Sequence, residues 1–431
     1  MLWGLGVGYV ISGEYFGWNL GLPAGGTYGM LAATLVITVM YVAFILSYTE
    51  LACAIPRAGG AFVYGARAMG PFGGFMAGLV QVVEFVFAPP AIAMAIGAYV
   101  QQRYPSVDPE HAAIAAYFVF TGINAAGVRL AAAFELVVTV LAVGELLLFM
   151  AVVAPDFSVA NLHKDPLPNG WGGAFAALPF AIWFYLAIEG VANAAEEARN
   201  PQRNVAIGFG AAIVTLVVLA LGVFFTAVGV DGWSTIVFPP GSADPSDAPL
   251  PLALAKVVSK ESWLFSVLLL IGLFGLIASF HGIILAAARA TMELGRARFL
   301  PGVLGVVNVR TGTPIFALAA NLAVGIVAIR SGRTGEIITL ACFGALSLYI
   351  LSMASLFILR RTEPELARPF RAVAYPVFPA LALAIAAISL VAMTLYNLAI
   401  AGVFFAIMAA GALYFLVLVR PRLGAGWRYD A

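Results

Sequence analysis

The chain has 431 residues, of which 63% are hydrophobic and only 10% are charged. Soluble domains carry about 25% charged residues, so this composition excludes a soluble globular protein and indicates a polytopic membrane protein. The net charge of +1 and the scattered basic residues exclude the clustered positive patch that nucleic-acid binding needs. The two cysteines, Cys53 and Cys342, are too few for a disulfide framework and are expected to be reduced thiols. No cleavable signal peptide is expected before the first span.

Apolar runs of some 20 residues can cross about 30 Å of hydrocarbon as helices. The sequence predicts twelve such spans, five in each half and two at the end. They cover residues 2–20, 29–53, 73–100, 112–127, 132–153, 173–194, 205–229, 263–288, 314–330, 335–359, 375–396 and 398–419. We therefore expect an all-α integral membrane protein.

The basic residues predict the orientation of these spans, because positively charged loops stay in the cytoplasm. Of the 22 Lys and Arg residues, sixteen fall on the side of the amino terminus and six on the other side. The six are Arg103, Lys164, Lys256, Lys260, Arg330 and Arg333. Both termini are therefore predicted to be cytoplasmic. A miscounted helix would scramble this asymmetry.

The first span is interrupted at Val10–Gly17, where glycines weaken the helix and Glu14 introduces a carboxylate. A carboxylate at the middle of a membrane costs roughly 2.5 to 3.5 kcal/mol, so it marks a functional site by default. The sixth span is interrupted in the same way at Ala187–Gly190, which contains Glu189. Paired interruptions in corresponding positions of two halves indicate the central site of a secondary transporter.

Four carboxylates are predicted inside the membrane, and no Lys or Arg lies at the same depth. They are Glu14, Glu84, Glu145 and Glu189, while Glu135 falls nearer an inner helix end. Intramembrane carboxylates normally pair with a partner or line a hydrated path. The excess of carboxylates over basic residues predicts that some of these carboxyl groups are protonated or that a cation binds to them.

Glu14 and Glu189 are the predicted partners of a substrate ammonium group, since Glu14 would repel a substrate carboxylate. For Glu14 the alternative is a structural carboxylate that accepts hydrogen bonds from its own broken helix, and for Glu189 it is a gate or a helix-stabilising role. Trp183 is a candidate gate that closes over the cation, because ring faces attract ammonium, although aromatic residues in membrane helices mostly pack. The predicted substrate-binding residues are Ser12, Gly13, Glu14, Tyr15, Trp183, Tyr185, Glu189 and Gly190.

Three further residues are candidates for proton coupling. Glu84 precedes Pro89 and Pro90, which must disrupt the third span locally, and burial would suit it to carry a proton near neutral pH. The alternative for Glu84 is a hydrogen bond that ties this span to a neighbour. Glu145 and His281 are the other two, although a lone histidine is more often a satisfied core residue.

Two hydrophilic stretches have predictable roles. Pro56 with Gly59 and Gly60 predicts a tight cytoplasmic turn, followed by an amphipathic interfacial segment. Residues 231–262 are predicted to cap an outer vestibule rather than to form a domain.

Catalytic chemistry finds little support. The three histidines have no metal-ligand spacing, and neither a phosphate-binding loop nor a serine elbow is present. No catalytic residue, metal or cofactor is predicted, and transport is expected to use an ion gradient.

Several motifs resemble the amino acid, polyamine and organocation transporters along nearly the whole chain. The similarity lies in the broken first helix at Ser12–Tyr15, the segment Glu50–Tyr64, the stretch Glu196–Arg203 and the helix end Ala288–Pro301. Ile11 and Ala187 depart from the family, which commonly has glycine at both places. With these departures, the two interruptions are most similar to those of the bacterial ethanolamine permease branch.

The resemblance implies a LeuT-like core of two inverted five-helix repeats with discontinuous first and sixth helices, working by alternating access. The repeats would be residues 1–153 and 171–360, and residues 374–420 would form two peripheral helices. Some relatives carry a lysine in the fifth helix in place of sodium, and the fifth span has none.

The resulting prediction is an inner-membrane proton symporter that imports ethanolamine or a similar small organic amine and contacts membrane lipid. The alternatives are a proton-coupled amino acid or polyamine permease, a channel or ligand-sensing receptor and, most remotely, an intramembrane enzyme.

Overall fold

The computed structural model describes residues 2–57, 59–127, 131–197 and 200–423. These residues form helices joined by turns and loops, and no strand occurs among them, so the predicted all-α class is confirmed. Cys53 and Cys342 are both buried, and no disulfide joins them. Arg129, Arg199 and Arg428, which contributed to the predicted orientation, lie outside the described residues.

Eight helices in the described part of the chain are long and apolar enough to cross a membrane. Two shorter apolar helices occupy residues 178–192 and 315–330. The eight contain α3 (Leu22–Ala54), α4 (Ala61–Arg103), α6 (Ala131–Val153), α10 (Pro201–Asp231), α13 (Trp263–Arg296), α15 (Thr334–Thr362), α16 (Val377–Tyr396) and α17 (Leu398–Tyr414). Helices α5 (Pro109–Ala126) and α14 (Ile315–Arg330) are not among them. The count of twelve spans and the inverted repeats stay predictions.

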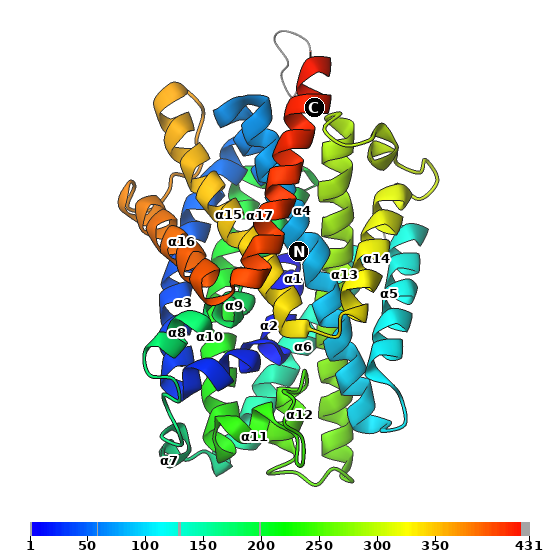
Figure 1. Cartoon of the computed structure of the whole chain (residues 1–431), viewed down its shortest axis with the longest axis vertical. Helices are drawn as coiled ribbons and strands as arrows, with labels where there is room; N and C mark the ends of the chain where they lie inside the picture. The colour runs from blue at the N-terminus through cyan, green and yellow to red at the C-terminus, as the bar shows by residue number, and fades with distance from the viewer. Residues whose placement is uncertain (1, 58, 128–130, 198–199, 424–431) are drawn as a thin grey trace.

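The helices run roughly along the long axis of the molecule, and short helices α7 (Val159–Leu162), α11 (Trp233–Val237) and α12 (Pro249–Leu254) gather at one end. The end of α17 lies at the opposite end (Figure 1). Helix α15 packs along α4, and α1 (Leu2–Val10) is enclosed by α6, α10 and α13. The interior is apolar and continuous, so each polar group within it requires its own explanation.

The first predicted interruption forms a break between short helical pieces. Helix α1 ends at Val10, α2 covers Ser12–Tyr15, and the 3₁₀ turn η1 covers Trp18–Gly21. Phe16 is extended, and Gly17 has a φ of 90°, which favours glycine. The chain then enters α3, which bends at Gly26, where φ is 60°.

The second interruption forms a matching break. Helix α9 (Leu178–Trp183) ends before a turn over residues 184–187, and the 3₁₀ helix η3 (Ile188–Glu197) follows. Ala187 has a φ of 75°, which is uncommon for a residue with a side chain. Such strain persists where the surrounding structure requires it, often at a functional site.

The two hydrophilic stretches are ordered against the bundle. Gly59 and Gly60 both have positive φ, and helix α4 begins immediately after them. In the stretch 231–262, the Ser246 carbonyl accepts a hydrogen bond of 2.8 Å from Asn19 Nδ2, and Asp247 Oδ2 accepts one of 2.7 Å from Thr334 Oγ1. These two contacts fix the loop to η1 and to the start of α15.

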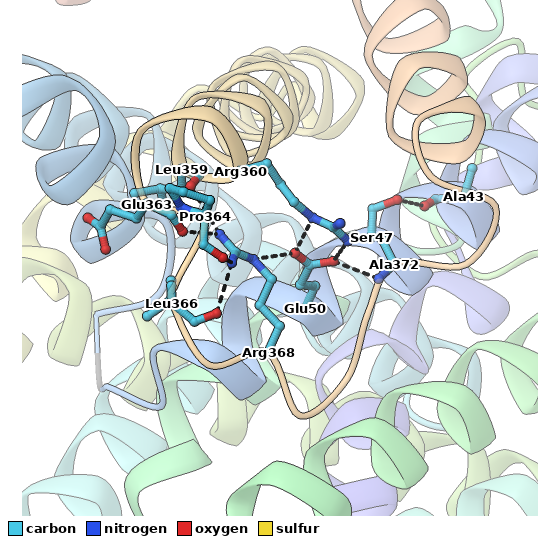
Figure 2. A network of polar contacts seen from close by, with 10 residues as sticks. All are labelled: Ala43, Ser47, Glu50, Leu359, Arg360, Glu363, Pro364, Leu366, Arg368 and Ala372. Carbon is cyan, nitrogen blue, oxygen red and sulfur yellow. Dashed lines mark hydrogen bonds and ion pairs between the residues drawn. The ribbon is translucent and has the colours of Figure 1, made fainter.

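A polar network at the other end holds Glu50 of α3 (Figure 2). Its carboxylate forms ion pairs with Arg360, at the end of α15, and with Arg368, which lies in the following loop. The Ala372 amide donates a further bond of 2.7 Å to Oε2. Glu50 therefore ties α3 to α15 and to the loop that leads to α16.

Candidate functional site

The two helix breaks meet at the centre of the bundle. A Cβ atom on Gly13 would lie 2.3 Å from the Trp183 carbonyl oxygen and 3.1 Å from the Phe184 Cα. Only a residue without a side chain fits there, so the backbone of α2 lies directly against the turn that follows α9. A Cβ on Gly17 would likewise lie 2.4 Å from the Trp183 ring.

Glu14 lies inside this junction and is fully buried. Neither of its carboxylate oxygens has a hydrogen-bond partner among the described residues. Tyr185, from the second break, lies close enough to interact electrostatically with the carboxyl group. The carboxylate is thus left free for a partner that the chain does not supply.

Glu189, the acidic residue of the second break, is 1% exposed. The Tyr349 hydroxyl of α15 donates to its Oε2 at 3.3 Å, and Oε1 has no partner among the described residues. Tyr349 is itself bonded to the Tyr41 hydroxyl of α3 at 2.9 Å. The second break is therefore tied to α15 and α3 through two tyrosines.

Glu84 of α4 lies beside Glu189. The two carboxyl groups interact with each other, and Glu84 also reaches the backbone of Ala187 at the strained turn. Glu84 is fully buried and neither of its oxygens has a geometrically good hydrogen bond within the described residues. Two carboxyl groups this close repel one another when both are charged, so a shared proton or a cation relieves the pair.

Aromatic side chains surround the junction of the breaks. The Trp183 ring packs edge-on against Phe16, with centroids 5.5 Å apart, and its Nε1 has no partner in the described chain. The Tyr185 hydroxyl is 2.6 Å from Thr38 Oγ1 of α3. Gly190 is the last of the predicted substrate-binding residues. It faces the Tyr9 ring, and a Cβ atom on Gly190 would lie 3.0 Å from that ring.

The other predicted proton carriers lie elsewhere. Glu145 of α6 lies beside Tyr15 and lines a narrow cavity against α12. His281 Nδ1 of α13 accepts a 3.0 Å bond from Asn124 Nδ2 of α5, and the His281 carbonyl accepts another from the same amide at 3.2 Å. The structure therefore brings together Glu84 and Glu189, places Glu14 at the junction of the breaks near Tyr185, and holds His281 against α5.

Ser279 has a structural role at the first break. Its hydroxyl donates to the Gly8 carbonyl at 2.6 Å and accepts from the Ser12 amide at 2.9 Å. One side chain of α13 thus satisfies backbone groups on both sides of the interruption. In the sequence, Ser279 is one polar residue within the apolar run 263–288, and nothing beside it indicates this function.

Tyr349, Tyr41 and Thr38 were also missed as neighbours of the site, because tyrosine and threonine are common in apolar helices. Glu135 was noted without a role. It is buried, its oxygens have no partner among the described residues, and it fills the space that Gly8 and Gly282 leave between α1 and α13.

No Lys or Arg in the described chain lies within ion-pair distance of these interior glutamates. The same residues contain no group of three or more His, Cys, Asp or Glu side chains that could hold a metal ion. Carboxylates without basic partners and aromatic ring faces are groups that attract cations.

Comparison with known proteins agrees with this geometry. Residues 2–426 match the family model described as amino acid permease. The chain is 28% identical to an uncharacterized transporter of Rhizobium meliloti (strain 1021), with 88% of this chain and 81% of the relative covered. It is 24% identical to the methylthioribose transporter of Bacillus subtilis (strain 168), covering 81% and 80% of the two chains. It is 22% identical to the branched-chain amino acid permease of the same organism, covering 78% and 75%.

The family match spans nearly the whole chain, and these relatives are transporters rather than enzymes. The predicted family and the predicted absence of enzymatic activity are therefore confirmed. The apolar helices and the family together indicate a multi-pass membrane protein. The chain belongs to the amino acid permease family of membrane transporters.

Proposed function

We propose that this transporter imports ethanolamine or a similar small organic amine by alternating access, driven by protons. The ammonium group binds between Glu14 and Glu189, where the two breaks meet. Ser12, Gly13 and Gly190 supply the backbone around it, and Tyr15, Trp183 and Tyr185 surround it. Trp183 is the gate.

The observation that carries the proposal is the uncompensated charge at the breaks. Glu14 and Glu189 are buried, and three of their four carboxylate oxygens lack a hydrogen-bond partner within the described residues. A buried carboxylate without a partner costs several kcal/mol if it stays charged. An ammonium substrate supplies the missing charge and the missing donors at once.

The backbone of the first break supports a substrate without a carboxylate. Four amides there already have acceptors: Ser12 donates to Ser279, Glu14 to Ile11, Phe16 to Ser12 and Gly17 to Asn19. A substrate carboxylate would need free amides at a broken helix. It would also meet the Glu14 carboxylate, which repels it.

Proton coupling is assigned to Glu84, with Glu145 and His281 as further candidates. Glu84 interacts with Glu189, so a proton on one carboxyl changes the charge that the other presents to the substrate. A proton on Glu84 removes the repulsion between the two carboxyl groups and leaves Glu189 charged for the ammonium, so the proton and the substrate can be bound together. This joint binding is the physical basis for symport in the proposed scheme.

The membrane arrangement proposed for the chain is that of twelve spans in an inner membrane, with both termini cytoplasmic. Residues 1–153 and 171–360 form inverted repeats, and residues 374–420 form two peripheral helices. The end that carries α11 and α12 is then outside, and the Glu50 network is cytoplasmic.

Binding is tested by measuring the thermal stability of the purified protein with ethanolamine, neutral amino acids and putrescine, because a ligand of the native state raises its apparent Tm. Ethanolamine should stabilise the wild type and leave Glu189→Gln unaffected. Glu110→Gln removes a carboxylate that pairs with Arg330 away from the breaks and should bind normally. Unchanged ethanolamine binding by Glu189→Gln would refute the site.

Coupling is tested by uptake of labelled ethanolamine into proteoliposomes. An inward proton gradient should drive accumulation in the wild type, and Glu84→Gln should bind substrate without responding to the gradient. Indifference to pH combined with dependence on sodium would overturn proton coupling. Failure to accumulate any amine against a gradient would favour a channel or a receptor.

A second candidate is an amino acid carrier of the same family. It is favoured by the likeness to a protein named branched-chain amino acid permease. In the thermal-stability panel, stabilisation by leucine, isoleucine or valine and not by ethanolamine would select it. A polyamine carrier would instead respond to putrescine.

A further inference from the structure

Glu135 of α6 is a buried carboxyl group that belongs neither to the proposed substrate site nor to the proposed coupling residues. It is 2% exposed, and neither of its oxygens has a hydrogen-bond partner among the described residues. Helix α6 runs toward the end that carries α7, α11 and α12, and Glu135 is near its beginning (Figure 1). It therefore lies toward the opposite end of the bundle, where a charged carboxylate without a donor is strongly disfavoured.

Two glycines make room for this carboxyl group between α1 and α13. A Cβ atom on Gly8 of α1 would lie 2.4 Å from Glu135 Oε1, and one on Gly282 of α13 would lie 3.1 Å from the same oxygen. A methyl group at Gly8 would therefore overlap the carboxyl group. A proton is the cation that needs no further space here, so the packed arrangement accommodates the neutral form of Glu135.

The neighbouring hydroxyl groups donate to the backbone of α1 instead. Thr139, one turn further along α6, donates to the Gly4 carbonyl at 3.2 Å. Ser279 of α13 donates to the Gly8 carbonyl at 2.6 Å. Both hydroxyls thus hold α1 in place, and Glu135 is the one polar side chain of this contact that gains nothing from being charged.

No basic side chain in the described parts of the packed helices compensates Glu135. The titratable residue of α1 is Tyr9, whose ring lies beside Gly282, and on α13 His281 is bonded to Asn124 of α5. Arg203 and Asp231 of α10 lie near the two ends of that helix. A proton is therefore what neutralises Glu135 while α1 stays packed.

We propose that Glu135 is a proton-binding site that holds α1 against α6 and α13, separate from the pair of Glu84 and Glu189. With its proton, the carboxyl group is neutral and fits between Gly8 and Gly282. When α1 moves away, water reaches the carboxyl group, which then ionises at neutral pH like any exposed glutamate. Packing of α1 thus takes up one proton, and its withdrawal releases one.

The first break lies at the end of this same helix. Ser279 bonds both the Gly8 carbonyl and the Ser12 amide, so a displacement of α1 alters the backbone that precedes Glu14. The proton on Glu135 thereby acts on the substrate site without contacting the substrate. This consequence rests on the proposed function, whereas proton binding by Glu135 does not.

The first test follows the packing of α1 without any substrate. Hydrogen exchange of residues 4–10 is measured in the purified protein at several pH values and corrected for the intrinsic exchange rate. Protection in the wild type should be greatest at low pH and fall by up to about ten-fold per pH unit, the limit for one linked proton. In Glu135→Gln, whose amide is always neutral, protection should be independent of pH. Glu135→Asp, which keeps the acid, should retain a dependence on pH.

The matched control is Glu145→Gln, which removes a buried carboxyl from the same helix but on the side of α12. It should retain the wild-type dependence on pH. A wild-type profile that is flat, or that Glu135→Gln leaves unchanged, would overturn the proposal. Sodium added at constant pH should have no effect on α1. Protection that rises with sodium in the wild type but not in Glu135→Gln would make the ligand a metal ion and overturn the assignment of a proton.

The second test detects the proton itself. At a pH where α1 is protected, the infrared spectrum of the wild type should contain the carbonyl band of protonated carboxylic acids, and Glu135→Gln should remove part of it. Glu363→Gln, which removes a carboxylate paired with Arg67 at 2.6 Å, should leave the band unchanged. A band that Glu135→Gln does not reduce would mean that Glu135 is charged while packed, and would overturn the proposal. Neither test uses ethanolamine, so a failure of the proposed substrate would not alter either result.

Discussion

Glu50 and Glu189 are both glutamates with about 1% of their surface exposed, but their surroundings are opposite. Glu50 has two arginines and a backbone amide on its carboxylate (Figure 2). Glu189 has one tyrosine hydroxyl at 3.3 Å and another carboxyl, that of Glu84. The charge of Glu50 is fully compensated by the chain, whereas the charge of Glu189 is not.

The arginines around Glu50 are themselves held in place. The Arg360 guanidinium lies over the Tyr375 ring, 4.2 Å from its centroid. Arg368 donates to the Leu359, Glu363, Pro364 and Leu366 carbonyls at 2.8 to 3.2 Å. A network whose members are all satisfied makes a rigid connection between helices. By contrast, the interior carboxylates retain open bonding capacity, which suits a ligand that comes and goes.

This contrast predicts the largest loss of stability at Glu50. Breaking one side of a buried ion pair costs about 3–5 kcal/mol, because the remaining charges stay buried without a partner. Glu50→Gln should therefore lower the apparent Tm strongly and reduce yield in detergent. Arg368→Ala should do nearly the same, since four carbonyls also lose their donor.

The matched control is the exposed pair of Arg333 and Glu336, 3.1 Å apart. Exposed pairs contribute about 0–1 kcal/mol, so Glu336→Gln should leave the Tm almost unchanged. A thermal scan in which Glu50→Gln and Glu336→Gln behave alike would remove the distinction between the two kinds of carboxylate.

A medium loss of stability is expected at Ser279, whose uncharged hydroxyl bonds the backbone on both sides of the first break. Ser279→Ala leaves the Ser12 amide and the Gly8 carbonyl without their partner, and each such buried group costs about 1–3 kcal/mol. The Tm should fall less than in Glu50→Gln, and hydrogen exchange should increase around residues 8–13. Ser355→Ala is a suitable control, because that hydroxyl only bonds the Leu351 carbonyl within its own helix.

The helices could be predicted because long apolar runs leave few other structures possible in a membrane. The predicted run 29–53 lies within α3, and the run 335–359 lies within α15. Helix α4 is longer than the predicted run 73–100, since it starts at Ala61, beyond the Gly59–Gly60 turn, and bends at Gly70. Such extensions are amphipathic or irregular, so hydropathy alone does not reveal them.

The acidic residues of the candidate site could be predicted one by one, but not their neighbours. A glutamate in an apolar run is conspicuous, whereas Tyr41 and Tyr349 are ordinary helix residues until the fold brings them together at 2.9 Å. Glu50 shows the same limit. Its position near a helix end is visible in the sequence, but its partners lie more than 300 residues away along the chain.

A smaller, pH-dependent effect is expected at Asp247, where the 231–262 stretch contacts α15. Burial raises the pKa of this carboxyl from 3.8 to about 6, and the hydrogen bond from Thr334 opposes that rise. The docked loop therefore binds more protons than a released loop between about pH 4 and pH 6. Docking should be strongest below that window and weaken as the pH rises through it, by about 1–2 kcal/mol after allowance for partial exposure.

The measurement is hydrogen exchange of residues 246–248 at several pH values. Asp247→Asn should make protection of this segment independent of pH across the window. Asp244→Asn, on the exposed part of the same loop, should retain the wild-type dependence. A wild-type profile that is flat, or that shows better protection at higher pH, would contradict the role of Asp247.

The smallest change in stability is expected at Glu84, although it is fully buried. Its carboxyl oxygens have no good hydrogen bond within the described chain, so Glu84→Gln removes little beyond the contact with the Ala187 backbone and also removes the repulsion from Glu189. The Tm should stay the same or rise, while proton-driven uptake should fall by at least about ten-fold, as the loss of a proton carrier predicts. A fall in Tm comparable to that of Glu50→Gln would mean that Glu84 is a structural carboxylate. The presence or absence of bonding partners around a buried glutamate would then not distinguish structural glutamates from those that act in transport.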